Sequence, residues 1–86
     1  MYTQQEKARI KWACRRGMLE LDVMIMPFYE ACFEALPAAE QQDFVALLEC
    51  DDPDLFRWVM RQGRSDDRRL ADMVDKIVAY NLGKHG

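Results

Sequence analysis

The segment that decides the fold is Trp12-Ala13-Cys14-Arg15-Arg16-Gly17-Met18-Leu19-Glu20-Leu21-Asp22, in which one glycine separates two helical patterns. Gly17 adopts a left-handed backbone at little cost, so it is a natural end for the first helix. Arg15 and Arg16 fall in the last turn of that helix and Glu20 in the first turn of the next, where each charge is favoured by its helix dipole. The segment therefore predicts an interhelical corner. A corner also places two guanidinium groups and a carboxylate on one small exposed surface, so a recognition patch is a second interpretation.

The composition indicates a small globular protein. The chain has 86 residues, of which 50% are hydrophobic and 31% are charged, enough for one modest core. We expect a single helical domain over residues 1–86, ordered from about residue 3 to 82. No apolar run approaches the ~20 residues that span a bilayer, and the polar N-terminus does not resemble a signal peptide. We therefore expect a cytoplasmic protein without direct membrane insertion.

Charge is unevenly distributed along the chain, although the formal net charge is only −3. The first predicted helix is basic, and residues 49–54 are acidic. This pattern fits a protein partner with mixed charges, or simply two solvated faces. Net acidity and the lack of a recognisable recognition helix argue against nucleic acid as a partner.

The sequence offers little for catalysis or metal binding. Its cysteines are Cys14, Cys32 and Cys50, an odd number without a C-x-x-C pair, which favours structural thiols in a reducing compartment. His85 is the sole histidine and Ser65 the sole serine, and they are far apart in sequence. There is no glycine-rich phosphate loop. We therefore expect no enzyme activity, no catalytic residues, no metal and no tightly bound cofactor.

Apolar periodicity predicts an all-α bundle of about five short helices without a sheet. The first helix begins at the capping box Thr3–Glu6 and runs to about Arg16. The second starts near Met18, and Pro27 is expected to kink or break it between residues 23 and 26. Trp12, beside the first apolar stripe, either closes the edge of the core or remains partly exposed as an anchor for a partner.

The later helices are marked by proline, aspartate and glycine. The third begins at Pro37 and stops near Cys50. Asp52 is expected to cap the fourth, which Gly63 ends, with Trp58 away from its buried stripe. The last helix opens at residues 65–67 and is terminated by Gly83, followed by a frayed tail. The residues predicted to face inward from the second helix onward are Leu21, Met24, Ile25, Phe28, Cys32, Phe44, Leu47, Leu48, Leu55, Phe56, Val59, Met60, Leu70, Met73, Val74, Ile77, Val78 and Leu82.

Several strings occur together in a familiar order. They are Lys7-Ala8-Arg9-Ile10, Trp12 to Met18, Glu20-Leu21-Asp22, Ile25-Met26-Pro27-Phe28 and Leu47 to Leu55. From about Glu6 to Val78 the chain resembles the SdhE (YgfY) family of bacterial flavinylation factors. The family's Arg-Gly-x-x-Glu signature corresponds to Arg16, Gly17 and Glu20.

The resemblance implies a five-helix protein that promotes covalent attachment of FAD to the flavoprotein subunit of succinate dehydrogenase, and of the related fumarate reductase. The bond would form between the flavin and a histidine of the client, so the chemical groups belong to flavin and client. We expect Arg16, Gly17 and Glu20 to form the centre of a client-binding surface, with Arg9, Arg15 and Asp51 nearby. Arg16 would pair with a client acceptor, and Glu20 would orient Arg16 or accept a hydrogen bond from the client. Binding of free FAD by the chain itself is expected to be weak or absent.

An alternative comes from the same resemblance, because some family members are described as the antitoxin partner, CptB, of a toxin–antitoxin pair. That interpretation would make the chain a protein-binding module without any effect on flavin attachment.

Overall fold

The computed structural model describes residues 2–84. It confirms the all-α class, and the described residues contain no strand. The helices are α1 (Gln4–Ala13), α2 (Leu19–Cys32), the short 3₁₀ helix η1 (Phe33–Ala35), α3 (Ala38–Leu48), α4 (Asp52–Val59) and α5 (Arg68–Lys84). No helix in this part of the chain is long and apolar enough to cross a membrane.

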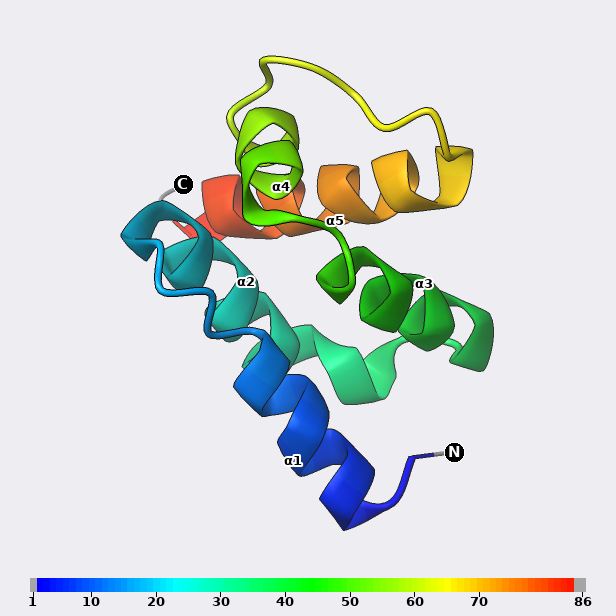
Figure 1. Ribbon diagram of the computed structural model, residues 1–86. Coiled ribbons are helices and arrows are strands. Elements are labelled where there is room, and N and C mark those ends of the chain that lie inside the picture. The colour runs from blue at the N-terminus through cyan, green and yellow to red at the C-terminus, as the bar shows by residue number, and fades with distance from the viewer. Residues whose placement is uncertain (1, 85–86) are drawn as a thin grey trace.

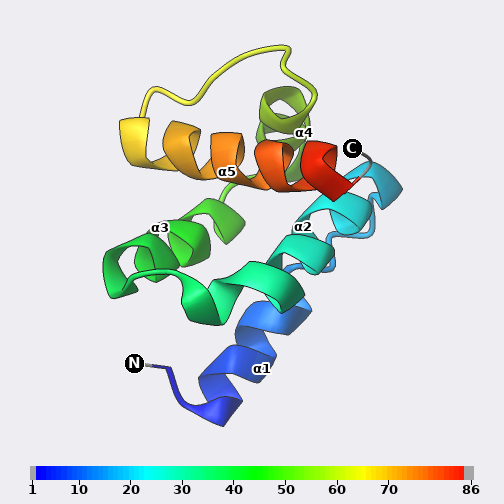
Figure 2. The ribbon, with the colours of Figure 1, turned by 180° about the vertical axis from the view of Figure 1, so that it is seen from behind.

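The helices surround one hydrophobic core. In Figures 1 and 2, α1 lies at the bottom and α4 and α5 lie at the top, with α2 and α3 between them. Helix α5 packs against α2, α3 and α4, as its cleanly amphipathic sequence predicts. The predicted inward stripes are largely confirmed. Leu21, Ile25, Phe44, Leu47, Leu55 and Ile77 are among the fully buried residues of the core.

The start of α1 matches the prediction, but its end does not. The Thr3 hydroxyl accepts a hydrogen bond from the Glu6 amide at 3.1 Å, and the Glu6 carboxylate accepts one from the Thr3 amide at 2.8 Å. These bonds hold the pKa of Glu6 below its usual value. The helix ends at Ala13, three residues before the predicted Arg16. The Arg16 amide donates to Asp22 instead of to a carbonyl of α1, which takes the chain out of the helix.

The break predicted near Pro27 is absent, because α2 runs through the proline to Cys32. Leu21, Ile25 and Phe28 are buried on one face on both sides of Pro27. Packing of this face holds the helix together despite the missing amide donor. The chain then tightens into η1, and Leu36 becomes extended before Pro37, as a residue preceding proline prefers.

The end of α4 was predicted wrongly at Gly63. The helix stops at Val59, and Arg61 takes the left-handed conformation with φ 62°. The Gln62 amide donates to the Arg57 carbonyl at 2.8 Å, and the Arg61 amide donates to the Trp58 carbonyl at 3.2 Å. This is a Schellman end formed without glycine. Trp58, predicted away from the buried stripe, is only 8% exposed.

The last helix begins where the sequence predicts but differs at its C-terminal end. Asp67 caps it, since its carboxylate accepts from the Arg69 amide at 2.9 Å. Gly83 lies inside α5 rather than terminating it, and Lys84 is still helical, so the expected tail does not begin there. The predicted tail residues His85 and Gly86 lie outside the described residues.

We predict that the three thiols differ sharply in reactivity. Cys14 is fully buried, and desolvation raises the pKa of its thiol to about 12, whereas Cys32 and Cys50 are half-buried. Because the thiolate is the reactive form, an aromatic disulfide reagent at pH 8 should titrate two thiols in the native protein and a third only on unfolding. Three thiols reacting at similar rates would contradict the burial of Cys14.

Candidate functional site

Gly17 forms the turn of the corner between α1 and α2. Its φ of +77° is the left-handed conformation that the sequence predicts. A Cβ built on Gly17 would meet no atom within 4 Å, so glycine is needed here for backbone conformation and not for space within the chain. The residue is exposed, and its open side faces solvent.

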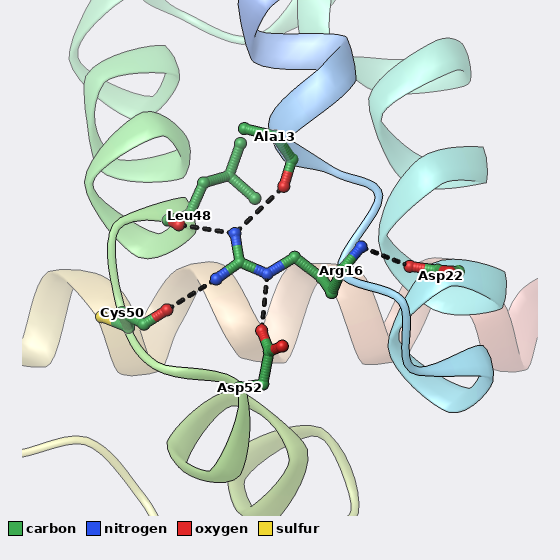
Figure 3. Close-up of polar contacts among 6 residues, drawn as sticks. All are labelled: Ala13, Arg16, Asp22, Leu48, Cys50 and Asp52. Atoms are coloured by element: carbon green, nitrogen blue, oxygen red, sulfur yellow. Dashed lines mark hydrogen bonds and ion pairs between the residues drawn. The ribbon is translucent and has the colours of Figure 1, made fainter.

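The Arg16 side chain turns inward and joins the corner to the α3–α4 connection (Figure 3). One terminal nitrogen donates to the Ala13 carbonyl at 3.0 Å and to the Leu48 carbonyl at 2.7 Å. The other donates to the Cys50 carbonyl at 2.8 Å. Its Nε donates to the Asp52 carboxylate at 2.7 Å, and the side chain is only 15% exposed. The guanidinium therefore satisfies carbonyls at the ends of both α1 and α3.

These contacts change the role we assign to Arg16. A guanidinium has five N–H donors, and four of them are used within the chain. The carboxylate that orients Arg16 is Asp52 rather than Glu20. Asp22 completes the corner by accepting from the Arg16 amide at 2.7 Å. Arg16 is thus a positioning residue that fixes the corner against residues 48–52.

The remaining predicted site residues are exposed. Glu20 lies in the first turn of α2, and in the described part of the chain its carboxylate has no hydrogen bond or ion pair. Arg9 lies on the surface of α1. The Arg15 guanidinium is 5.9 Å from the centroid of the Trp12 ring. Trp12 is 73% exposed, so it does not close the core. Whether these groups bind a partner stays a prediction.

Helix α4 starts one residue earlier than the sequence predicts, since Asp52 was expected to be the N-cap and Pro53 the first helical residue. Asp51 is the N-cap of α4, although its side chain makes no capping hydrogen bond, and Asp52 is the first helical residue. Asp51 is exposed. It lies beside the corner, since Arg16 contacts the Cys50 carbonyl and the Asp52 carboxylate, which belong to the residues on either side of Asp51. The Asp-Pro pattern located the helix start but gave no sign of the long-range partner of Asp52.

This arrangement predicts unequal effects of two neighbouring substitutions. Asp52→Asn should lower the free energy of unfolding by about 2 kcal/mol, because Arg16 loses its charged acceptor in a half-buried setting. Asp51→Asn should change it by less than about 0.5 kcal/mol, since asparagine is an equally good N-cap. Both variants remove one negative charge from the N-terminal end of α4. The loss of charge–dipole stabilisation is therefore the same in the two variants. Equal losses in a urea titration would contradict the role of Asp52.

The Arg16 and Asp52 side chains of the corner are partly buried. None of the buried residues in the described part of the chain is polar or charged. No cluster of three or more His, Cys, Asp or Glu residues there is placed to hold a metal ion. Burial and the adjacent Asp54 raise the pKa of Cys50, so this thiol beside the corner is not activated as a nucleophile.

The fold and the corner define a small all-helical protein with a preformed polar surface motif. The family described as flavinator of succinate dehydrogenase matches residues 8–81. The chain therefore belongs to this family.

Similar proteins extend over the whole chain. It is 74% identical over 84 residues to a Vibrio parahaemolyticus protein named FAD assembly factor SdhE, covering 98% of both chains. A Yersinia pseudotuberculosis protein of the same name is 56% identical over 78 residues, covering 91% of this chain and 89% of the relative. The solution structure of a UPF0350 protein is 71% identical, with a TM-score of 0.81, and the match covers 98% of this chain and 89% of that one.

Proposed function

We propose that this protein promotes covalent attachment of FAD to the flavoprotein subunit of succinate dehydrogenase, acting in the cytoplasm, and that it serves the fumarate reductase flavoprotein in the same way. The observation that carries the proposal is the whole-chain similarity to proteins named FAD assembly factor, which includes Arg16, Gly17 and Glu20 within the matched residues.

The corner supports a binding role in this process. Arg16 already donates to four acceptors within the chain, so it is poorly placed to hold the diphosphate of FAD. FAD is therefore a substrate that the client binds. The exposed groups of Gly17 and Glu20, with Arg9, Arg15 and Asp51 around them, contact the client.

The protein contributes no nucleophile, so it acts on the population of client conformations. The attachment rate depends on how often the flavin and the accepting side chain are held in attack geometry. A partner that binds this conformation more tightly than the open one raises its population and hence the rate. Each factor of ten in rate requires about 1.4 kcal/mol of differential binding. A few exposed contacts at a rigid corner suffice for this.

The experiment uses apo-flavoprotein, FAD and a dicarboxylate, with and without this protein. Flavin fluorescence of the client band on a denaturing gel is followed against time. The proposal predicts faster attachment that saturates as the protein is titrated. An unchanged rate with a client that does accept flavin would overturn it and leave a binding module of the antitoxin type.

A further inference from the structure

An open apolar groove lies between the start of α2, the end of α4 and the C-terminal part of α5. It has a volume of about 740 Å³, and its apolar lining consists of Val23, Met24, Val59, Met60, Val78 and Leu82. These three segments lie together in both views of the molecule (Figures 1 and 2). Asn81 also lines the groove and joins α5 to α2 by donating to the Met24 carbonyl at 3.1 Å. The groove is thus a fixed feature of the helix packing.

The groove continues onto an exposed apolar surface. Leu82 is 70% exposed, Val23 is 53% exposed and Leu19 is 73% exposed. Leu19 and Val23 are four residues apart on α2, so they share one face of that helix. Single exposed leucines are ordinary on protein surfaces, but a contiguous patch that opens into a groove indicates an interaction site.

Arg61 lies at the rim of the groove, and Arg64 lies beside it on the α4–α5 connection. Arg61 donates to Asp75 at 2.8 Å, and Arg64 donates to the same carboxylate at 3.1 and 3.3 Å. Two guanidinium groups thus share the hydrogen bonds of one carboxylate, and Asp72 also acts electrostatically on Arg64, so Arg61 is the guanidinium of this group that lines the groove. Arg61 holds this place in a left-handed conformation that a glycine would adopt at lower cost.

The groove is connected to the corner through α2. Glu20 follows Leu19 directly, so the Gly17–Glu20 corner and the apolar face of Leu19 and Val23 adjoin each other. We propose that the groove is the second half of the client-binding surface, and that it takes an apolar client segment carrying a carboxylate that meets Arg61 and Arg64. This inference rests on the proposed function, because it names the flavoprotein as the occupant.

The test measures the dissociation constant for apo-flavoprotein by calorimetry and the attachment rate by flavin fluorescence. Leu82→Glu and the double variant Val23→Glu, Leu82→Glu put negative charge into the groove at exposed positions. Ala31→Glu, at an exposed position further along α2, is the matched control. Circular dichroism verifies that each variant is folded, and Leu82→Glu alone suffices if the double variant is not.

The expected result is a dissociation constant raised by on the order of tenfold or more in the groove variants, and unchanged in Ala31→Glu. At a protein concentration below the dissociation constant, the attachment rate should fall in the groove variants by about the same factor as the affinity, and stay at the wild-type value in Ala31→Glu. Arg61→Gln with Arg64→Gln should weaken binding and reduce its salt dependence.

Two results would overturn the inference while leaving the proposed function intact. One is a wild type that accelerates attachment together with groove variants that bind the client equally well. The other is a wild type that dimerises by light scattering, with groove variants that are monomeric and bind the client normally, because the groove would then hold a second copy of the chain. Failure of the wild type to accelerate attachment would instead refute the proposed function.

Discussion

Replacing Arg16 with alanine is expected to lower the free energy of unfolding by about 3 kcal/mol and to abolish stimulation of flavin attachment. The substitution removes the donor from the carbonyls of Ala13, Leu48 and Cys50 and the counter-ion from Asp52. The corner would then lose its fixed relation to the start of α4. For a small domain, a loss of this size is a large part of the total stability.

Urea unfolding and the attachment assay together test this prediction. Arg15→Ala is the control for the unfolding measurement only, because Arg15 is the neighbouring arginine, is exposed and lies over the Trp12 ring. It should cost less than about 1 kcal/mol. Arg16→Lys should fall between the two, since one ammonium group cannot reach acceptors on all sides of the guanidinium plane. An Arg16→Ala variant as stable as the wild type would contradict the positioning role.

Replacing Gly17 with leucine is expected to abolish stimulation while the protein remains folded. The left-handed φ of +77° makes leucine cost about 1 to 2 kcal/mol, which the fold should tolerate. The new side chain would point into open space, because no atom lies within 4 Å of the Cβ position. The loss of stimulation would therefore come from a clash with the client and should appear as weaker client binding.

Gly17→Asn separates the two contributions to this effect. Asparagine adopts the left-handed conformation more readily than leucine and has a shorter side chain. It should be more stable than Gly17→Leu and retain more client affinity. Helical content by circular dichroism and the client dissociation constant are the measurements. Wholesale unfolding of Gly17→Leu would assign the glycine a purely structural role.

Capping patterns and apolar periodicity predicted the helices correctly where the determining residues lie within one segment. The Thr3 capping box and the α5 stripe depend on residues three or four apart, and both were found as predicted except at Leu82, which was expected to face inward and is 70% exposed. These patterns failed where packing decides. Pro27 is held inside α2 by its buried face, and Arg61 ends α4 before Gly63 is reached. Trp58 is buried because the buried face of α4 consists of Leu55, Trp58 and Val59, which are three and four residues apart, and Phe56 and Met60 lie at its margin.

The same distinction applies to the site. The left-handed corner at Gly17 follows from the identity of one residue. The partners of Arg16 lie more than thirty residues away in three cases, and three of its four acceptors are backbone carbonyls, which carry no sequence signal. Asp52 is the one acceptor among these four that uses its side chain. Its position before Pro53 led us to predict a helix N-cap instead of a partner for Arg16.

The most direct test of the account is the rate of covalent flavin attachment with Glu20→Ala. Glu20 is exposed, and among residues 2–84 its carboxylate has no hydrogen bond or ion pair, so stability should fall by no more than about 0.5 kcal/mol. Asp66→Ala, an exposed acidic residue on the α4–α5 connection, is the control. We predict that Glu20→Ala is folded and fails to accelerate attachment, whereas Asp66→Ala acts as the wild type does. A Glu20→Ala protein that accelerates attachment at the wild-type rate would contradict the claim that the corner binds the client.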